Sequence, residues 1–258
     1  MADFPLHPAS TPPEDIEVLG HRVRCLAGRR IGELAARAGL AVPVDSVHGK
    51  GFVGQLIELW LGAGASSLAR PDFTQLGVEL KTLPVNHEGK PLQSTYVSRV
   101  PLHNLHALEW NTSTVFTKLR HVLWVPVQSD RELALVERVV GQAFFWQPRA
   151  EEDALLRADW EFHLARILAG DVERIRGSDG AVLQVRPKAS SSRASTWSRP
   201  ADGDALLTGP RGFYLRPAFT RYLIERYFHG RMPEDLAGLK AEQRRPDGVG
   251  AVKGTAST

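Results

Sequence analysis

The stretch Arg70-Pro-Asp-Phe-Thr-Gln-Leu-Gly-Val-Glu-Leu-Lys81 decides the fold class and the chemistry that we expect of this chain. Side chains alternate between the two faces of a β-strand, so the Leu-Gly-Val-Glu-Leu run predicts a strand with its apolar residues in a core. Glu79 and Lys81 then share the opposite face, about 7 Å apart along the strand. Asp72 precedes the strand, and we expect it to fold back beside Glu79.

This arrangement of two carboxylates and one lysine suits a hydrolytic metal site. Two carboxylates can hold a hard divalent cation, and an ammonium group can meet an attacking water or a phosphate oxygen. The stretch is therefore compatible with metal-dependent hydrolysis of phosphodiester bonds. The alternative is an amphipathic strand with a solvated salt bridge. Because Glu-x-Lys is a common tripeptide pattern, these residues by themselves leave both interpretations equally open.

The composition is that of a globular protein with one large domain or two small lobes. The chain has 258 residues, which is enough to bury a sizeable core. The net charge of +3 means that any basic surface is local, and the isoelectric point of about 9.2 gives mild support for an anionic partner. Cys25 is the only cysteine, so no intramolecular disulfide is possible and a cytoplasmic location is expected. The first residues do not resemble a signal peptide, and no apolar run is long enough for a membrane span.

Prolines, glycines and apolar periodicity divide the chain into an arm, a domain and a tail. We expect a flexible N-terminal arm over residues 1–13, one folded domain over 14–229, and a disordered, charge- and glycine-rich tail over 230–258. Inside the domain, helical spacing and capping signals predict helices that start at Thr11 and at residues 31, 52, 150 and 217. Strands are predicted at 122–125, 133–140, 144–146 and 182–186, and a hairpin at 84–100.

Glu58 is unusual because it is the only charged residue between Lys50 and Arg70. It lies in a very apolar predicted helix, where a charge is costly unless it is paired or bound to a metal. A buried salt bridge with a distant arginine is the structural alternative. We favour a functional role, because only one loop separates Glu58 from the Asp72–Glu79 pair.

Two basic segments are candidates for contact with an anion. Glycines on both sides of Lys50 would let the backbone approach a phosphate at a helix start, although Gly-Lys-Gly is also an ordinary turn. Between Arg186 and Arg216 basic residues cluster with Phe213 and Tyr214, which fits either a DNA-contacting edge or a solvated loop. Lys118, ahead of a buried strand, carries little information by itself. His103 and His106 have metal-ligand spacing but no third ligand nearby, so solvated loop histidines are expected.

Several segments together resemble the MutH family of strand-nicking endonucleases of DNA mismatch repair. This family belongs to the type II restriction-endonuclease-like nucleases, and the restriction enzyme Sau3AI is related to it. Order and spacing fit from about residue 14 to 228. The matching segments are Ile-Gly-Glu-Leu-Ala (31–35), Lys-Gly-Phe-Val-Gly-Gln-Leu-Ile-Glu-Leu-Trp-Leu-Gly-Ala (50–63), Asp-Phe-Thr-Gln-Leu-Gly-Val-Glu-Leu-Lys-Thr (72–82), Lys-Leu-Arg-His-Val-Leu-Trp-Val-Pro-Val (118–127), Gln-Val-Arg-Pro-Lys-Ala (184–189) and Pro-Arg-Gly-Phe-Tyr-Leu (210–215).

The resemblance implies a fold and a role for each matching residue. The fold would be α/β, with a mixed β-sheet core flanked by helices and two lobes that form a DNA-binding cleft. The resemblance makes Asp72, Glu79 and the Leu80 carbonyl ligands of Mg²⁺. The rest of the implied active site is Glu58 in the metal shell, Lys81 as the catalytic lysine, and Lys118. The implied DNA contacts are Lys50, Gly51, Arg186, Pro187, Lys188 and Tyr214, with a weaker match at Tyr96.

The resemblance also implies a reaction and partners. We expect a monomer that nicks the unmethylated strand of double-stranded DNA at hemimethylated GATC sites, activated by MutL after MutS finds a mismatch. Tyr214 would help to sense adenine methylation. Two other classes of function stay open at this stage. One is a free-standing GATC restriction endonuclease that cuts both strands, and the other is a non-catalytic DNA-binding module with this fold.

Overall fold

The computed structural model describes residues 7–44, 51–64, 70–101, 108–188, 196–198, 206–208, 210–230 and 239. Within these ranges, no helix has the length and apolar character that crossing a membrane requires. Most of the predicted tail and the first half of the predicted arm lie outside the described residues, as do Lys50, His103 and His106.

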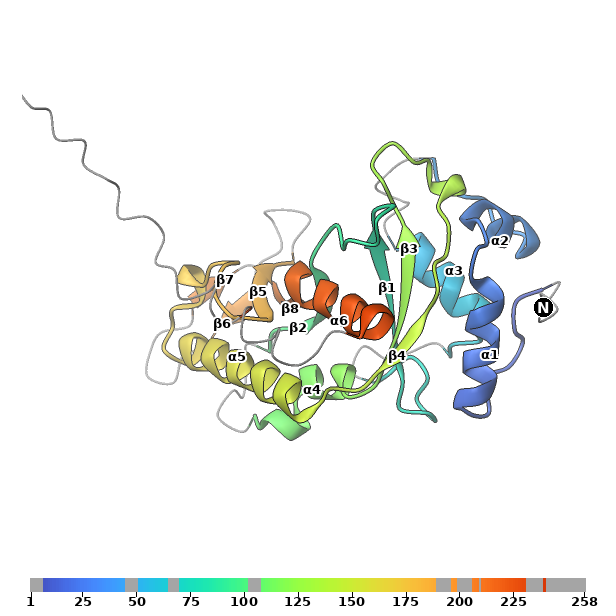
Figure 1. Cartoon of the computed structure of the whole chain (residues 1–258). Coiled ribbons are helices and arrows are strands. Elements are labelled where there is room, and N and C mark those ends of the chain that lie inside the picture. The colour runs from blue at the N-terminus through green and yellow to red at the C-terminus, as the bar shows by residue number, and fades with distance from the viewer. Residues whose placement is uncertain are drawn as a thin grey trace, which may run out of the picture.

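A three-stranded mixed sheet stands at the centre of the molecule (Figure 1). Its middle strand β3 (Val122–Gln128) pairs in parallel with β1 (Glu79–Val85) and antiparallel with β4 (Phe144–Trp146). Six of the seven residues of β3 are buried, as expected for a strand that is covered on both faces. The sheet therefore separates two hydrophobic cores, and successive residues of β3 belong to one core and then the other.

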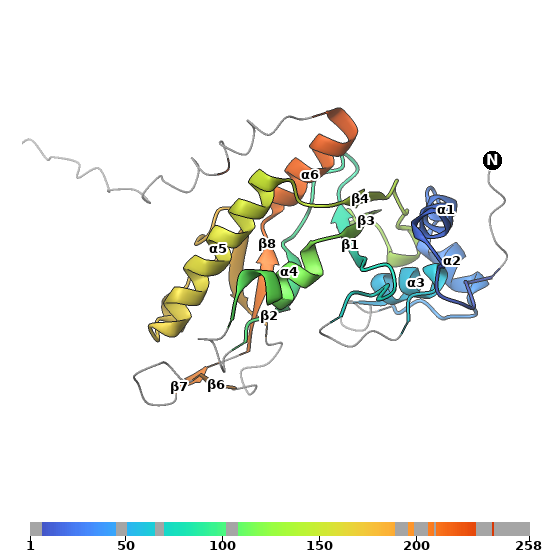
Figure 2. The same ribbon diagram turned by 90° about the horizontal axis from the view of Figure 1, so that it is seen from below.

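The first core, which we call the N-terminal core, lies between this sheet and three helices. These are α1 (Ile16–Leu26), α2 (Ile31–Arg37) and α3 (Phe52–Leu61), all on the same side of the sheet in Figures 1 and 2. Leu123 and Val125 of β3 pack into this core. The helix α1 begins where the Asp15 carboxylate accepts a hydrogen bond from the Val18 amide at 2.8 Å, so Asp15 and not Thr11 is its N-cap.

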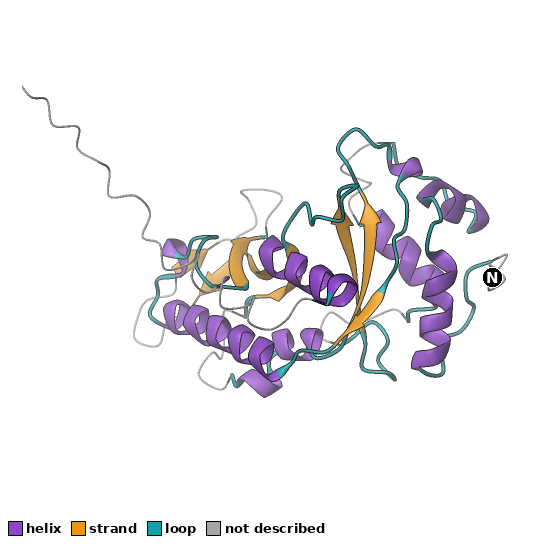
Figure 3. Ribbon diagram, in the orientation of Figure 1, coloured by secondary structure: helices purple, strands orange, loops and turns teal. Residues whose placement is uncertain are grey.

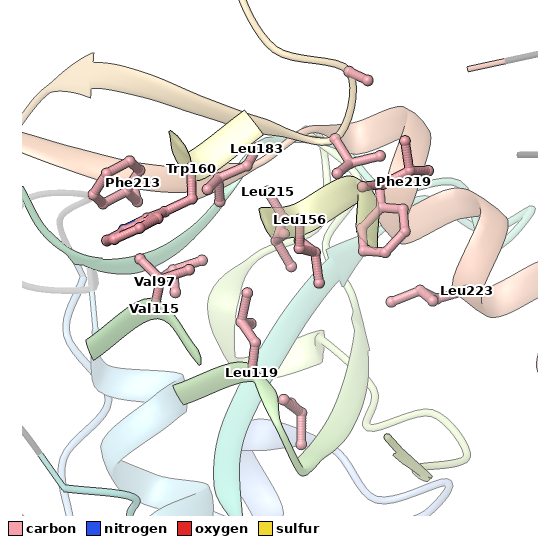
Figure 4. Close-up of a cluster of buried hydrophobic side chains, with 14 of the residues drawn as sticks. Val97, Val115, Leu119, Leu156, Trp160, Leu183, Phe213, Leu215, Phe219 and Leu223 are labelled. Carbon is pink, nitrogen blue, oxygen red and sulfur yellow. The ribbon is translucent and has the colours of Figure 1, made fainter. Parts of the chain in front are cut away.

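The second core, which we call the C-terminal core, lies on the opposite face of the central sheet. It contains Trp124 of β3 and the apolar side of a second, antiparallel sheet in the order β2-β8-β5. Figure 4 shows how its side chains interlock. The elements around it are β2 (Thr95–Arg99), α4 (Thr114–Leu119), α5 (Ala150–Leu168), β5 (Leu183–Pro187), β8 (Arg211–Leu215) and α6 (Pro217–His229).

The remaining elements are short. Three are single-turn 3₁₀ helices: η2 (Trp110–Thr112), η3 (Leu135–Glu137) and η4 (Val172–Arg174). A small antiparallel pair consists of β6 (Thr196–Ser198) and β7 (Leu206–Thr208).

Hydrogen bonds from a buried carboxylate fasten the second sheet to helix α5. The Asp159 carboxylate accepts hydrogen bonds from the backbone amides of Ala181, Val182 and Leu183, at 2.8, 2.6 and 2.8 Å. His163, one turn further along α5, is fully buried and bonds through Nε2 to the Leu183 carbonyl oxygen at 3.0 Å. The start of β5 is thus held by side chains of one helix, which fixes the strand that continues to Arg186.

Three further local predictions differ from the structure, and one helix was not predicted. The strand that carries Glu79 and Lys81 starts at Glu79 and not at Leu76, because a turn with Gly77 at φ 65° precedes it. Residues 84–100 do not form a hairpin, since β1 and β2 belong to different sheets. The strand predicted at 133–140 is wrong: η3 occupies its middle, and only isolated bridges of Val139 and Val140 remain. The short helix α4 was not predicted, because its six residues are mixed in character.

Candidate active site

Glu79 is a buried carboxylate held between two lysines. It begins β1 and is 4% exposed, on the face of the central sheet that also carries Lys81. Lys81 Nζ lies 3.0 Å from its Oε1, and Lys118 Nζ lies 2.7 Å from its Oε2. Burial raises the pKa of Glu79, and the charge of Lys81 is the largest influence that opposes this shift. Lys118 lies in α4, and this helix brings its side chain to Glu79. Its place just ahead of a strand in the sequence does not explain the contact.

Lys118 also connects the strand to the segment that precedes it. Its Nζ donates a second hydrogen bond to the backbone carbonyl of Arg70, at 2.6 Å. Two residues later, the Asp72 carboxylate accepts a hydrogen bond from the Leu80 amide at 2.8 Å. Asp72 folds back on the strand as the sequence predicted, beside Leu80 and close enough to Glu79 to raise the pKa of that residue.

The backbone of Leu80 faces the free edge of the sheet. The Glu79 amide bonds across to the His121 carbonyl in the β3 direction, so the peptide groups of Leu80 point the other way. The Leu80 amide already meets Asp72 on that side. Its carbonyl oxygen points to the same edge of the sheet as its amide, which is the edge where Asp72 lies.

Glu58 reaches the site from the N-terminal core. It lies in α3 and is partly buried. Burial raises its pKa most strongly, and the nearby charges of Asp72 and Glu79 raise it further. Among the described residues Glu58 forms no ion pair with an arginine, and the positive charges that act on it are those of Lys118 and Lys81.

The donor atoms at this site are oxygens, which is the chemistry that Mg²⁺ prefers. Three carboxylates influence one another electrostatically, and their mutual repulsion is what a divalent cation would relieve. In the described part of the chain, no three acidic, histidine or cysteine side chains are gathered closely enough to hold an ion by themselves. The fit therefore rests on Asp72, Glu79 and the Leu80 carbonyl, with Glu58 close by.

A cleft of about 650 Å³ joins β1, the strand that carries Glu79 and Lys81, to the second sheet. Its walls come from strands of both sheets, which Figure 3 shows in orange. Gly51 also lines it, at the start of α3, where φ of 96° favours glycine. The predicted DNA contacts that line this cleft are Gly51, Tyr96, Arg186, Pro187, Lys188 and Tyr214, and the predicted active-site residues that line it are Leu80 and Lys81.

Two tyrosines from neighbouring strands form the aromatic part of the cleft. Tyr96 and Tyr214 are directly paired between β2 and β8, and their ring centroids lie 5.3 Å apart at 67°. Lys188 Nζ lies 4.0 Å from the Tyr96 ring centroid and donates to the Tyr96 hydroxyl at 2.7 Å. Burial lowers the pKa of Lys188, and the charge of Arg99 lowers it further. The sequence did not draw attention to Arg99, which lies near enough to affect both Lys188 and Tyr96.

Arg186 is exposed and is oriented by a serine that the sequence also left unnoticed. Its Nη1 donates to the Ser94 hydroxyl at 3.2 Å, and the same hydroxyl accepts from Gln184 Nε2 at 2.6 Å. The guanidinium carbon lies 5.9 Å from the Tyr214 ring centroid. A planar guanidinium held in this way presents its other donors to the cleft.

The fold and the site together define a class of protein. A mixed sheet that carries acidic residues and a lysine on one strand, at the side of a basic and aromatic cleft, is the arrangement of a restriction-endonuclease-like nuclease.

Comparisons with known proteins specify the family. The sequence model described as "DNA mismatch repair enzyme MutH" matches residues 61–159. The DNA mismatch repair protein MutH of Enterobacter sp. (strain 638) is 48% identical over 225 residues, which cover 87% of this chain and 98% of that protein. The protein of the same name from Salmonella paratyphi C (strain RKS4594) is 49% identical over 223 residues, which cover 86% and 96%. The chain belongs to the MutH family of DNA mismatch repair endonucleases and is an endodeoxyribonuclease.

Proposed function

We propose that this endonuclease nicks the unmethylated strand of double-stranded DNA at hemimethylated GATC sites, and that it requires Mg²⁺. The observation that carries the proposal is a single cleft in which Leu80 and Lys81 of the catalytic strand face Tyr96, Arg186 and Tyr214 of the second sheet. A duplex in this cleft would present a phosphate to the first group and base edges to the second.

Each residue of the site has a chemical role in this proposal. Asp72, Glu79 and the Leu80 carbonyl would hold Mg²⁺, which when bound supplies Lewis-acid activation of water and phosphate. Lys81 stabilises or orients the attacking hydroxide from its position 3.0 Å from Glu79. Lys118 positions Glu79 and the Arg70 segment at the same time, and Glu58 adds negative charge to the metal shell.

Substitution of Glu79 tests the catalytic half of the proposal. Glu79→Ala should lower the Mg²⁺-dependent nicking rate on the order of a thousandfold or more, because a metal ligand is lost. DNA binding should be retained or tighter, because one negative charge near the phosphate disappears. A supercoiled GATC plasmid with Mg²⁺, and with EDTA as the metal-free control, gives the rate. Near-normal nicking by the variant would contradict the assignment.

Arg186 tests the recognition half. A bidentate contact with guanine would make Arg186→Ala lose roughly 1–3 kcal/mol of discrimination, so that binding to GATC duplexes weakens and binding to scrambled duplexes does not. A phosphate contact would weaken both equally. Equal losses on the two duplexes would remove Arg186 from the residues that read bases.

The biological setting that we propose is methyl-directed mismatch repair in the cytoplasm, with a monomeric enzyme that MutL activates after MutS has found a mismatch. The assay compares unmethylated, hemimethylated and fully methylated GATC plasmids, with and without MutL. Stimulation by MutL and nicking of only the unmethylated strand support the proposal. Double-strand cuts at low enzyme concentration would indicate a free-standing restriction endonuclease, and Mg²⁺-dependent binding without cleavage would indicate a DNA-binding module.

A further inference from the structure

Gly212 lies beneath the two tyrosines of the cleft. It is in the middle of β8, where it pairs with Arg99 of β2 and with Arg186 of β5. A Cβ atom at this position would lie 2.9 Å from Cε2 of Tyr96 and 3.0 Å from Cε2 of Tyr214. It would also lie 3.3 Å from the Ser98 carbonyl oxygen. The distance to Tyr96 is shorter than Cβ atoms show, and the distance to Tyr214 is tighter than nine in ten such contacts, so both rings would have to shift to admit any other residue.

The backbone does not explain this glycine. Gly212 is not among the glycines with positive φ, and its pairing with β5 is regular. The pairing of β8 with β2 shifts register between Tyr96 and Ser98, so that irregularity lies on the partner strand and not at Gly212 itself. A glycine inside a strand weakens the strand, and it often marks a site of close approach. The close approach here is made by the two rings, which explains why a side chain is missing from this position.

The position of the rings is coupled to the charged groups of the cleft. The Tyr96 hydroxyl accepts a hydrogen bond from Lys188, and the Tyr214 ring lies near the Arg186 guanidinium. If a Cβ atom at position 212 displaced the rings, the Tyr96 hydroxyl would move away from Lys188 and the Tyr214 ring would move away from Arg186. The space above Gly212 fixes two aromatic rings and, through them, the surroundings of two basic side chains.

We propose that Gly212 is a positioning residue that seats Tyr96 and Tyr214, and that this seat sets the affinity and the GATC preference of the cleft. The inference rests on the proposed function, because it assigns the two rings to contact with DNA. Gly212 itself would not touch the DNA. Its absent side chain would act only through the rings above it.

Gly212→Ala is the direct test, measured by fluorescence anisotropy with GATC and scrambled duplexes and by the single-turnover nicking rate at saturating DNA. The dissociation constant for the GATC duplex should rise about tenfold, the size of one lost base-edge contact, here that of Arg186 beside the Tyr214 ring. The scrambled duplex should bind as before, and the saturated nicking rate should stay close to that of the wild type. An unchanged dissociation constant for GATC DNA would overturn the proposal.

A variant that lacks both tyrosine rings shows whether Gly212→Ala acts through these rings or by weakening strand β8 in general. In Tyr96→Ala/Tyr214→Ala, adding Gly212→Ala should cause no further loss of GATC binding, because the two rings that the new methyl group would displace are gone and only the Ser98 carbonyl oxygen remains near it, at 3.3 Å. The same loss in both backgrounds would overturn the proposal. Gly177→Ala is the matched control, since its Cβ would meet only Gln184 Oε1 at an ordinary 3.5 Å, and it should bind like the wild type.

Folding of the variants is part of the test. If Gly212→Ala alone fails to fold, the triple variant Tyr96→Ala/Tyr214→Ala/Gly212→Ala should fold. If the triple variant also fails to fold, the rings are not what Gly212 accommodates.

The wild-type ratio of GATC to scrambled binding reports separately on the proposed function. Equal affinity of the wild type for GATC and scrambled duplexes would count against GATC recognition. In that case the effect of Gly212→Ala on duplex affinity would still show whether Gly212 positions the two rings.

Discussion

The charge balance around Glu79 gives a prediction that needs neither DNA nor metal. One buried carboxylate faces two buried ammonium groups, at 3.0 and 2.7 Å. Glu79→Gln keeps the shape and removes the negative charge, so that both lysines face a neutral amide. Breaking buried ion pairs from one side costs about 3–5 kcal/mol, and we expect a loss of this size in the free energy of unfolding.

Lys118→Met should be milder, although it removes two hydrogen bonds. These bonds, to Arg70 and to Glu79, are worth about 1.5–3 kcal/mol each if charge-assisted. Against this loss, Glu79 keeps its second ion pair, with Lys81 at 3.0 Å, so its buried carboxylate is not left without a partner. We therefore expect a net cost of about 2–3 kcal/mol, smaller than that of Glu79→Gln.

The double variant shows whether the two residues act as one unit. Once Lys118 is Met, Glu79→Gln breaks one ion pair instead of two, so its cost should fall by about 1–3 kcal/mol. Urea unfolding followed by tryptophan fluorescence, with EDTA present, measures all four corners of the cycle. If Glu79→Gln costs the same in both backgrounds, the contact between Glu79 and Lys118 does not contribute to the folded protein in solution, and the reasoning fails.

Three further predictions concern the C-terminal core. Asp159→Asn should lower the free energy of unfolding by about 2–4 kcal/mol in urea melts and should weaken GATC binding, because the amides of residues 181–183 lose a charged acceptor. Burial lowers the pKa of His163, so this histidine binds a proton more readily in the unfolded chain than in the folded one. The free energy of unfolding should therefore fall as the pH drops below about 6.5. His163→Gln should make this dependence on pH less steep in urea melts at several pH values. Arg226→Met should cost about 3–5 kcal/mol by leaving the fully buried Glu152 without its ion-pair partner, and Arg226→Met/Glu152→Gln should recover part of this loss in the same melts.

Local patterns in the sequence predicted the parts of the site that depend on near neighbours. The helix at 52–61 was predicted with its observed bounds, since its apolar run lies between glycines at both ends. The return of Asp72 to the catalytic strand was also predicted, because only a short turn separates them. The wrong strand at 133–140 shows the limit of this approach, since an apolar run of that length fits a strand and an irregular buried segment equally well.

Contacts between distant segments could not be predicted from the residues alone. Lys118 is separated from Glu79 by 39 residues, and α4, which carries it, is too short to leave a periodic signal. The resemblance to a family supplied the place of Lys118 in the site but not its second bond to Arg70. Gly212 left no signal either, because a missing side chain becomes informative only when the rings above it are located.

The parallel pairing of β1 with β3 has a consequence for how the protein matures after synthesis. Parallel neighbours need a long intervening connection, and contacts between distant parts of a chain form slowly during folding. Lys118 reaches Glu79 and Arg70 only when this pairing and the docking of α4 are complete. A nascent or partly unfolded chain would therefore be unable to cut. The topology delays the hazardous chemistry of a nuclease until the cleft that directs it has formed.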